Sequence, residues 1–327
     1  MGLKPEPNQD QRSGQEQDER PTVVFLMGPT GAGKTDVAVE LVKRLPCDII
    51  SVDSALVYKG MDIGTAKPDN AVLAQAPHRL INICNPVESY SAARFRGDAC
   101  VEIESILAQG RIPLLVGGTM LYFRALANGL SKLPAADTSL RQALESQAQN
   151  EGWTAMHRRL QLIDPQAGQR IHPNDPQRIL RALEVYEKTG TPMSELQGQS
   201  EPLPYRIIRL VVAPAERAEL HRRIERRFHI MMAQGFLTEV ESLYRRDDLH
   251  ADLPAMRAVG YRQLWAYLAS TDALSLETAV QRGITATRQL AKRQLTWLRS
   301  EPEGAKWFDG SDKNMLSSIL KTLGDAQ

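Results

Sequence analysis

The sequence Thr22-Val-Val-Phe-Leu-Met27 runs directly into Gly28-Pro-Thr-Gly-Ala-Gly-Lys34-Thr35, and no other stretch says as much about the architecture. An apolar run of strand length precedes a complete G-x-x-x-x-G-K-[ST] phosphate loop, and apolar residues continue after it at helical spacing. In such a loop the backbone N–H groups point into a concavity at the positive end of a helix. The sequence therefore predicts a binding site for a di- or triphosphate.

Each residue of this loop is expected to take part in the phosphate site. Lys34 would add a full positive charge, and Thr35 would offer a hydroxyl to Mg²⁺, the expected cofactor. The alternative is a glycine-rich turn without a ligand, and the flanking strand and helix patterns argue against it. The predicted phosphate-binding residues are Gly28, Pro29, Thr30, Gly31, Ala32, Gly33, Lys34 and Thr35.

A second apolar run, Asp48-Ile-Ile-Ser-Val-Asp53, ends in a carboxylate. As a buried parallel strand it would carry Asp53 to the carboxyl edge of the sheet, where open α/β sheets bind ligands. Asp53 could act as a general base, or it could cap a turn or hold Mg²⁺ through water. A later run, 112–116, ends in Gly117-Gly118-Thr119 instead of the Asp of a Walker-B strand. This weakens an ordinary kinase or NTPase interpretation without excluding it.

The order of the elements predicts an α/β fold with a helical insertion. Expected strands at 22–27, 48–52, 79–83 and 112–116 alternate with helices at 33–45, 91–109 and 119–128, as a doubly wound parallel sheet requires. Residues 138–200 carry only helical patterns, at 138–151, at 154–163 and from an Asp175 cap to Gly190. A strand at 206–212 then returns to the core, followed by long helices from Pro214 to about Tyr244 and from Gly260 onward. The predicted divisions are a disordered tail at 1–20, the first part of a P-loop core at 21–135, a helical insertion at 136–202 and the completion of the core with C-terminal helices at 203–327.

Composition favours a cytoplasmic protein. The chain has 327 residues and a formal net charge of +1, and no apolar run approaches the roughly 20 residues that span a bilayer. The three cysteines, Cys47, Cys84 and Cys100, are scattered along the chain. We therefore expect reduced, mostly buried thiols and no metal site formed by cysteines. Between residues 257 and 299 there are seven basic and two acidic residues. Such an excess suits an anionic partner, although a solvated basic face is the alternative.

Several motifs, in order along the chain, resemble those of the bacterial tRNA dimethylallyltransferases. They are the phosphate loop, Ser51-Val-Asp-Ser-Ala-Leu-Val-Tyr58, Met61-Asp-Ile-Gly-Thr-Ala-Lys-Pro68, Val116-Gly-Gly-Thr-Met-Leu-Tyr122, Asp175-Pro-Gln-Arg-Ile-Leu-Arg181, Arg257-Ala-Val-Gly-Tyr-Arg262 and Ala291-Lys-Arg-Gln-Leu-Thr-Trp-Leu-Arg299. This family moves the dimethylallyl group of dimethylallyl diphosphate to N6 of the adenosine 3′-adjacent to the anticodon, in tRNAs reading codons that begin with U. The resemblance implies that reaction, tRNA and dimethylallyl diphosphate as partners, no membrane partner, and a monomer. Leu56 departs from the Gln of many relatives.

The resemblance also implies roles for individual residues. Asp53 would accept the N6 hydrogen, Thr119 would lie in the channel where base and donor meet, and Arg223 would clamp the diphosphate. Thr119 could instead only cap the helix that follows it. Arg223 lies among several arginines that flank a predicted buried stripe formed by Leu220, Ile224, Phe228 and Met231. The positions implied to contact tRNA are Asp53, Ser54, Ala55, Leu56, Thr119, Arg141, Gln177, Arg178, Ile179, Leu180, Arg181, Arg257, Ala258, Val259, Gly260, Tyr261, Arg262, Lys292, Arg293, Gln294, Leu295, Thr296, Trp297, Leu298 and Arg299.

Three functional classes therefore compete. A prenyltransferase would release diphosphate and depend on a tRNA acceptor. A small-molecule kinase or NTPase would share the loop but need a γ-phosphate, and the Gly-Gly-Thr end of 112–116 argues against it. A non-catalytic RNA-binding scaffold would need no working phosphate site, and the intact Lys34, Thr35 and Asp53 argue against that class.

Overall fold

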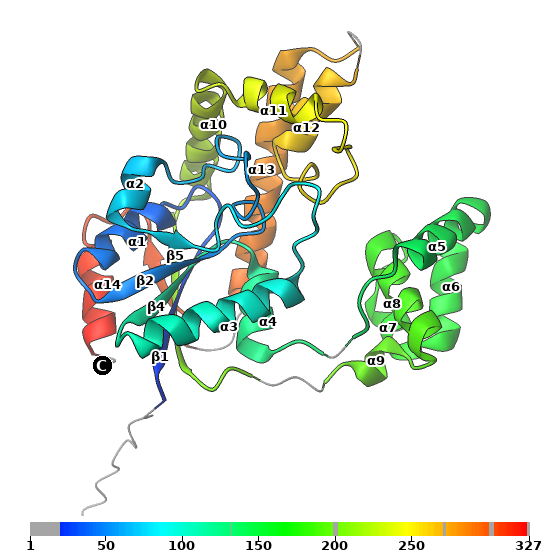
Figure 1. Cartoon of the computed structure of the whole chain (residues 1–327), viewed down its shortest axis with the longest axis horizontal. Helices are drawn as coiled ribbons and strands as arrows, with labels where there is room; N and C mark the ends of the chain where they lie inside the picture. The colour runs from blue at the N-terminus through cyan, green and yellow to red at the C-terminus, as the bar shows by residue number, and fades with distance from the viewer. Residues whose placement is uncertain (1–19, 132, 199–201, 271–272, 301–303, 326–327) are drawn as a thin grey trace, which may run out of the picture.

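The computed structural model of the chain describes residues 20–131, 133–198, 202–270, 273–300 and 304–325 (Figure 1). Its centre is a parallel sheet of six strands in the order β3-β2-β4-β1-β5-β6. The strands are β1 (Thr22–Met27), β2 (Cys47–Val52), β3 (His78–Arg79), β4 (Ile112–Gly117), β5 (Arg206–Ala213) and β6 (Lys306–Asp309). Parallel neighbours need crossover connections, which place helices on the faces of the sheet.

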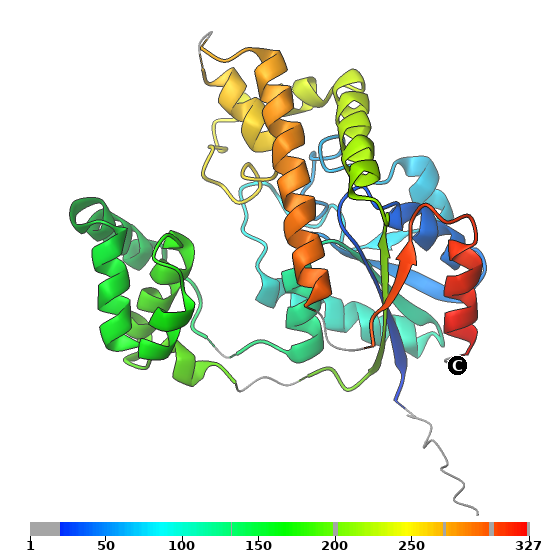
Figure 2. The same cartoon turned by 180° about the vertical axis from the view of Figure 1, so that it is seen from behind.

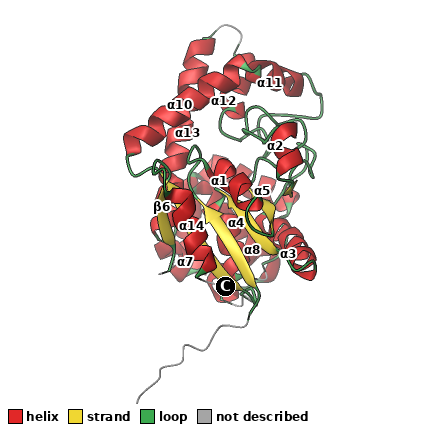
Figure 3. Ribbon diagram, turned by 90° about the vertical axis from the view of Figure 1, so that its left-hand side faces the viewer, coloured by secondary structure: helices red, strands yellow, loops and turns green. Residues whose placement is uncertain are grey.

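Both faces of the sheet are buried. Along β1, Val23, Phe25 and Met27 point into one hydrophobic cluster, whereas Val24 and Leu26 point into a second one on the other side. The first cluster is covered by α3 (Ala92–Ala108) and α4 (Met120–Asn128), and the second by α1 (Lys34–Val42) and α14 (Met315–Gly324). Figure 3 shows the strands with helices packed around them. The predicted doubly wound α/β fold is confirmed.

The region between α4 and β5 is helical. It contains α5 (Thr138–Glu151), α6 (Trp153–Ile163), α7 (Pro165–Arg170), α8 (Pro176–Thr189) and α9 (Met193–Leu196). These helices bury a separate cluster that includes Leu160, Ile179 and Leu183. Figures 1 and 2 show them to one side of the sheet, joined to it by two chain segments. The predicted caps of α8 are confirmed, since the Asp175 side chain accepts from the Arg178 N–H and Gly190 ends the helix in the left-handed region.

The C-terminal helices stand over the carboxyl edge of the sheet. They are α10 (Arg217–Ala233), α11 (Phe236–Tyr244), α12 (Tyr261–Leu268) and α13 (Leu276–Arg299), while the short α2 (Asn70–Gln75) follows β2. In Figure 2 the long orange helix is α13, which runs from the α12 end of the molecule towards α4. The predicted buried stripe of α10 is confirmed, because its buried residues are Leu220, Ile224, Phe228 and Met231.

Several predicted boundaries were wrong, for local reasons. The strand expected at 79–83 is reduced to His78–Arg79, since Leu80 and Asn82 have φ values of 61° and 55° that no strand can continue. The region expected to be helical from 214 to about 244 contains α10 and α11, which are divided at Gly235, whose φ is 100°. The region expected to be helical from Gly260 onward contains α12 and α13, and the sequence did not predict β6 or α14. The predicted tail at 1–20 lies outside the described residues except for Arg20.

The structure also bears on the expected state of the cysteines and on the expected lack of a membrane-spanning segment. The three cysteines are free; Cys47 and Cys84 are buried and Cys100 is half-buried. Burial raises the pKa of the Cys47 thiol to about 11, as expected for a structural and unreactive cysteine. Within the described ranges, no helix combines the length and the apolar character needed to cross a membrane.

Candidate active site

The phosphate loop depends on its glycines. Gly31 and Gly33 have φ values of 82° and 88°, which other residues adopt only with strain. A Cβ atom on Gly28 would lie 2.2 Å from the Val212 carbonyl oxygen, so the end of β1 meets β5 too closely for a side chain. Gly33 immediately precedes α1, which places the loop N–H groups at the positive end of that helix.

Lys34 lies at the bottom of this loop with its ammonium group partly buried. Its Nζ donates to the Pro29 carbonyl at 2.9 Å. Burial lowers the pKa of Lys34 to about 8, with Asp53 acting to raise it and Arg227 acting to lower it. Lys34 therefore shares its pocket with a carboxylate and a second cation, and an anion bound in the loop would raise its pKa again.

Asp53 follows β2 at the same edge of the sheet. The β2–β4 register pairs Val52 with Gly117, and a Cβ on Gly117 would lie 2.0 Å from the Val52 carbonyl oxygen. Asp53 Oδ1 accepts from the Ala55 N–H at 2.8 Å, whereas Oδ2 has no hydrogen bond in the part of the chain that the structure describes. One carboxylate oxygen thus caps the turn, as the sequence alternative proposed, while the other is left to accept a proton.

Thr119 begins the segment after β4. It occupies the N-cap position of α4, yet its side chain makes no capping hydrogen bond. Instead its Oγ1 accepts from the Ser54 N–H at 3.0 Å. The alternative that Thr119 simply caps its helix is therefore wrong: its side chain fixes the backbone next to Asp53.

Two arginines of α10 approach the loop. Arg223 Nε donates to Glu219 Oε1 at 2.7 Å and its Nη2 donates to Ser311 Oγ at 3.1 Å, which holds Arg223 at the rim of the site. Arg227 reaches further in and donates to the Thr30 hydroxyl. Burial lowers the pKa of Arg227, and nearby Asp53 opposes that shift. Sequence reasoning missed Arg227, although its spacing of four from Arg223 places both on one helix face.

Gln294 joins the loop to the end of β4. Its Oε1 accepts from the Thr30 N–H at 2.9 Å, and its Nε2 donates to the Gly118 carbonyl at 2.7 Å. The residue is only 9% exposed, and a Cβ on Gly118 would collide with its amide at 2.5 Å. Both ends of the amide are thus used inside the protein. The implied contact of the Gln294 side chain with tRNA needs correction, since that side chain braces the phosphate loop.

Most of these groups surround one pocket of about 500 Å³ at the carboxyl edge of the sheet, whereas Thr119 is not among the residues that line it. The phosphate loop, Asp53, Leu56, Arg223, Arg227 and Gln294 all line it. Ser51 also lines it, and the buried Ser51 Oγ has no hydrogen-bond partner among the described residues. A hydrated Mg²⁺ next to Thr35 fits this donor set, because Mg²⁺ keeps several waters and needs few protein ligands. The pocket therefore has the groups to hold a diphosphate with its metal and a carboxylate beside it.

Comparison with known proteins shows to which family the chain belongs. The family model for IPP transferase matches residues 56–301, and the model for isopentenyl transferase matches residues 21–85. The chain belongs to the IPP transferase family. A curated relative, the tRNA dimethylallyltransferase of Thioalkalivibrio sulfidiphilus, is 61% identical over 284 residues, which are 86% of this chain and 88% of the relative. The family resemblance inferred from the motifs is confirmed, and the chain is an enzyme of this prenyl-transferring family.

Solved structures of family members have the same fold. The full-length tRNA isopentenylpyrophosphate transferase of Bacillus halodurans matches with a TM-score of 0.69 and 36% identity, covering 94% of this chain and 97% of that one. A tRNA isopentenylpyrophosphate transferase of Staphylococcus epidermidis matches with a TM-score of 0.67 and 31% identity, covering 94% and 100%. A eukaryotic dimethylallyltransferase acting on tRNA has a TM-score of 0.77 at 26% identity, covering 93% and 77%.

In this transferase, the positions implied to contact tRNA differ in exposure. Helical periodicity turns some side chains of each segment outwards and others into the core. The exposed ones are Ser54, Gln177, Arg178, Arg257, Arg262, Lys292, Arg293, Thr296 and Arg299. The partly exposed ones are Asp53, Ala55, Leu56, Thr119, Arg141, Arg181, Ala258, Val259, Leu295 and Trp297. The buried ones are Ile179, Leu180, Gly260, Tyr261, Gln294 and Leu298, and these positions support their segments from the protein interior instead of facing RNA.

Two implied tRNA contacts of the transferase also have structural partners. Arg141 forms a two-pronged pair with Glu184, with both N–O distances 3.1 Å, and Arg181 Nη1 donates to the same carboxylate at 2.7 Å. Glu184 is fully buried. Burial acts to raise the pKa of Glu184, but the hydrogen bonds from Arg141, the Asp137 N–H and Arg181 hold it below its ordinary value. Arg178 is less constrained: its side chain is 68% exposed and, among the described residues, forms an ion pair with Asp175 alone, at 3.4 Å.

Proposed function

We propose that the protein transfers the dimethylallyl group from dimethylallyl diphosphate to N6 of the adenosine 3′-adjacent to the anticodon, in tRNAs reading codons that begin with U. Family membership supplies the coarse reaction, transfer of a dimethylallyl group to tRNA. The observation that carries the finer proposal is the single pocket that joins a phosphate loop to the free oxygen of Asp53. We also propose that the enzyme is cytoplasmic, as its composition suggests, and that it works as a monomer, as the family resemblance implies.

The cations of the pocket suit the leaving group. As the bond between dimethylallyl C1 and the diphosphate oxygen breaks, negative charge grows on the diphosphate. Lys34, the loop N–H groups, Arg227 and, at the rim, Arg223 are placed to stabilise that charge. Thr35, with Ser51 and Asp53 nearby in the pocket, would hold Mg²⁺, which would supply further neutralisation of that charge.

Asp53 is suited to act on the acceptor adenine. The N6 lone pair of adenine is delocalised into the ring, so this amino group attacks carbon only weakly. When the C–N bond forms, one N6 proton must leave, and Asp53 Oδ2 is the proposed acceptor. Thr119 steadies this end of the pocket by fixing the backbone of Ser54, and it is proposed to border the base.

The acceptor adenine must leave its stack to enter the pocket. Base extrusion costs a few kcal/mol, which contacts to the RNA backbone have to offset. The exposed cations on α8, before and in α12, and on α13 are the proposed source of those contacts. They include Arg178, Arg257, Arg262, Lys292 and Arg299.

Mapping the modified nucleoside tests this function. Bulk tRNA incubated with the protein, dimethylallyl diphosphate and Mg²⁺ should yield N6-dimethylallyladenosine on digestion. Sequencing of modified fragments should place it beside the anticodon of tRNAs that read U-initial codons. Label at another base, or at this position in tRNAs of all codon classes, would refute the finer proposal.

Donor affinity should depend on pH through Lys34. The pKa of this lysine is about 8, so its ammonium form, which binds the diphosphate, is lost as the pH rises through that value. We expect the affinity for dimethylallyl diphosphate, measured by calorimetry without RNA, to fall about tenfold between pH 7 and pH 9. A Lys34→Arg variant remains charged throughout and should show a flat profile. Equal affinities of the wild type at both pH values would contradict this role.

Salt dependence tests the RNA surface. Each phosphate contact contributes just under one unit to the slope of log K against log salt. We expect Arg178→Ala and Lys292→Ala each to weaken tRNA binding and to reduce this slope by about one unit. Arg178 is a better probe than Arg181, which also neutralises buried Glu184. Arg245→Ala, an exposed arginine at the end of α11, is the control and should change neither quantity. Unchanged slopes for both test variants would show that the proposed footprint is wrong.

A further inference from the structure

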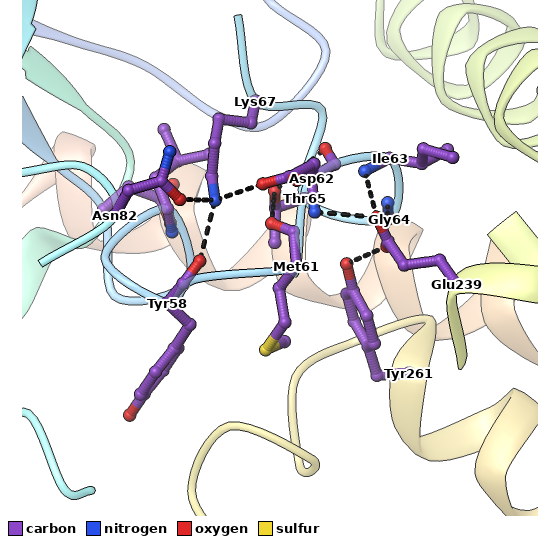
Figure 4. A network of polar contacts seen from close by, with 12 residues as sticks. Tyr58, Met61, Asp62, Ile63, Gly64, Thr65, Lys67, Asn82, Glu239 and Tyr261 are labelled. Atoms are coloured by element: carbon purple, nitrogen blue, oxygen red, sulfur yellow. Dashed lines mark hydrogen bonds and ion pairs between the residues drawn. The ribbon is translucent and has the colours of Figure 1, made fainter. Parts of the chain in front are cut away.

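Glu239, on α11, binds a loop of the backbone as if it were a ligand (Figure 4). Its Oε2 accepts from the Asp62 N–H at 2.8 Å and from the Ile63 N–H at 2.7 Å, while Oε1 accepts from the Gly64 N–H at 3.1 Å. Three successive N–H groups that converge in this way form a nest for an anion. Here the anion is a side chain contributed from a distant part of the same chain.

Lys67 secures the same loop from the opposite side. Its side chain is only 3% exposed. Its Nζ donates to the Tyr58 carbonyl at 2.7 Å, to Asp62 Oδ1 at 2.6 Å and to Asn82 Oδ1 at 2.6 Å (Figure 4). The stretch Met61–Pro68, called the 61–68 segment below, is thus held between a carboxylate and an ammonium group.

The 61–68 segment forms a wall of the candidate active site. Thr65, Ala66 and Pro68 line the pocket that also contains the phosphate loop and Asp53. Ala66 has a φ of 55°, a conformation that persists only where the surrounding structure enforces it. The position of this wall therefore depends on the groups that hold the segment, and Glu239 supplies most of the hydrogen bonds to its backbone N–H groups.

The remaining hydrogen bond to Glu239 comes from Tyr261, whose hydroxyl donates to Oε1. Burial and, after it, the Glu239 charge raise the pKa of Tyr261 far above its ordinary value, so this hydroxyl remains a donor. The Tyr261 ring is fully buried, and a Cβ on Gly64 would lie 2.7 Å from it. Ring and carboxylate therefore both press directly on the 61–68 segment.

Tyr261 also belongs to the 257–262 stretch, which carries the exposed Arg257 and Arg262. One carboxylate thus joins a wall of the donor pocket to a surface proposed for RNA. We propose that Glu239 is a positioning residue for prenyl transfer, which couples RNA contact at Arg257 and Arg262 to donor binding through Tyr261 and the 61–68 segment. This inference rests on the proposed function. Because coupling is reciprocal, RNA should raise the affinity for the donor diphosphate, and diphosphate should raise the affinity for RNA by the same factor.

The coupling can be measured without turnover. Inorganic diphosphate with Mg²⁺ and an unmodified anticodon stem-loop RNA cannot react with one another. Calorimetry on the full-length wild type should show diphosphate binding at least about fivefold tighter when the RNA is present. Tyr261→Phe keeps the ring and removes only the hydroxyl, so diphosphate affinity without RNA should stay within about twofold while the RNA effect disappears.

Glu239→Gln tests the carboxylate itself. In Gln, an NH₂ group replaces one of the two carboxylate oxygens. This group is itself a donor, so it cannot accept from the N–H groups of the nest. Hydrogen bonds to a charged group correspond to about a tenfold change or more in an equilibrium constant. We expect kcat to fall about tenfold, at a temperature well below the melting point of the variant, with the RNA effect on diphosphate binding lost. Glu241→Gln, on the same helix and paired with Arg245 at the surface, should behave like the wild type.

The outcomes separate this inference from the proposed function. A wild type that transfers no dimethylallyl group to tRNA would refute the proposed function. A wild type that transfers the group but binds diphosphate equally well with and without RNA would refute the coupling alone. Retention of the RNA effect in Tyr261→Phe would overturn the inference as well, even if Glu239→Gln failed to fold.

Discussion

Replacement of Asp53 by Asn is expected to lower the turnover of tRNA at least ~10²-fold while leaving tRNA affinity nearly unchanged. Asn keeps the acceptor that binds the Ala55 N–H, so the turn after β2 should survive. What it removes is the anionic oxygen that would take the N6 proton. Single-turnover assays with saturating tRNA and dimethylallyl diphosphate measure this chemical step directly.

Asp69→Asn is the matched control for this variant, and a role of Asp53 in binding Mg²⁺ is the alternative explanation to be tested. Asp69→Asn alters an exposed carboxylate that caps α2, where Asn caps equally well, and should leave turnover within about twofold. If Asp53 mainly served Mg²⁺, a raised Mg²⁺ concentration would rescue Asp53→Asn. Near-wild-type turnover of this variant at ordinary Mg²⁺ concentration would refute the assignment of Asp53 as the base.

Lys34→Ala is expected to abolish transfer, with a loss in kcat/KM of at least ~10³-fold. The variant loses a charge-assisted contact to the diphosphate that strengthens as the group departs. The tRNA affinity should persist, because Lys34 lies within the pocket and not among the exposed cations. Lys43→Ala, at the other end of α1 and paired with Glu40 at the surface, provides the control. Transfer by Lys34→Ala at a rate near that of the control would show that the loop does not bind the leaving group.

The features that could be predicted from the sequence are those determined by residues close to one another in the chain. The phosphate loop, the caps of α8 and the buried stripe of α10 each follow from residues within a few positions of one another. The continuous apolar run of β1 was equally readable as a strand, because both faces of a parallel sheet are buried. Where a backbone turned left-handed without a warning in its residue type, as at Leu80, prediction failed.

The features that could not be predicted depend on partners far away in the chain. Arg227 meets Thr30 across 197 positions, Gln294 meets Thr30 across 264, and Glu239 meets Asp62 across 177. The local pattern places Arg227 on the helix face of Arg223, but it does not show which distant group any of these three side chains contacts. The resemblance named continuous segments as tRNA contacts, whereas helix periodicity decides which of their side chains are exposed.

In the proposed reaction, the phosphate loop holds a diphosphate that leaves while carbon is transferred to RNA. The most direct test incubates the purified protein with dimethylallyl diphosphate labelled in the dimethylallyl group, with and without bulk tRNA, and ATP replaces the donor in parallel. We predict label in tRNA, one diphosphate released for each group transferred, and little release without tRNA. Hydrolysis of ATP at an ordinary catalytic rate with no label in tRNA would contradict the account.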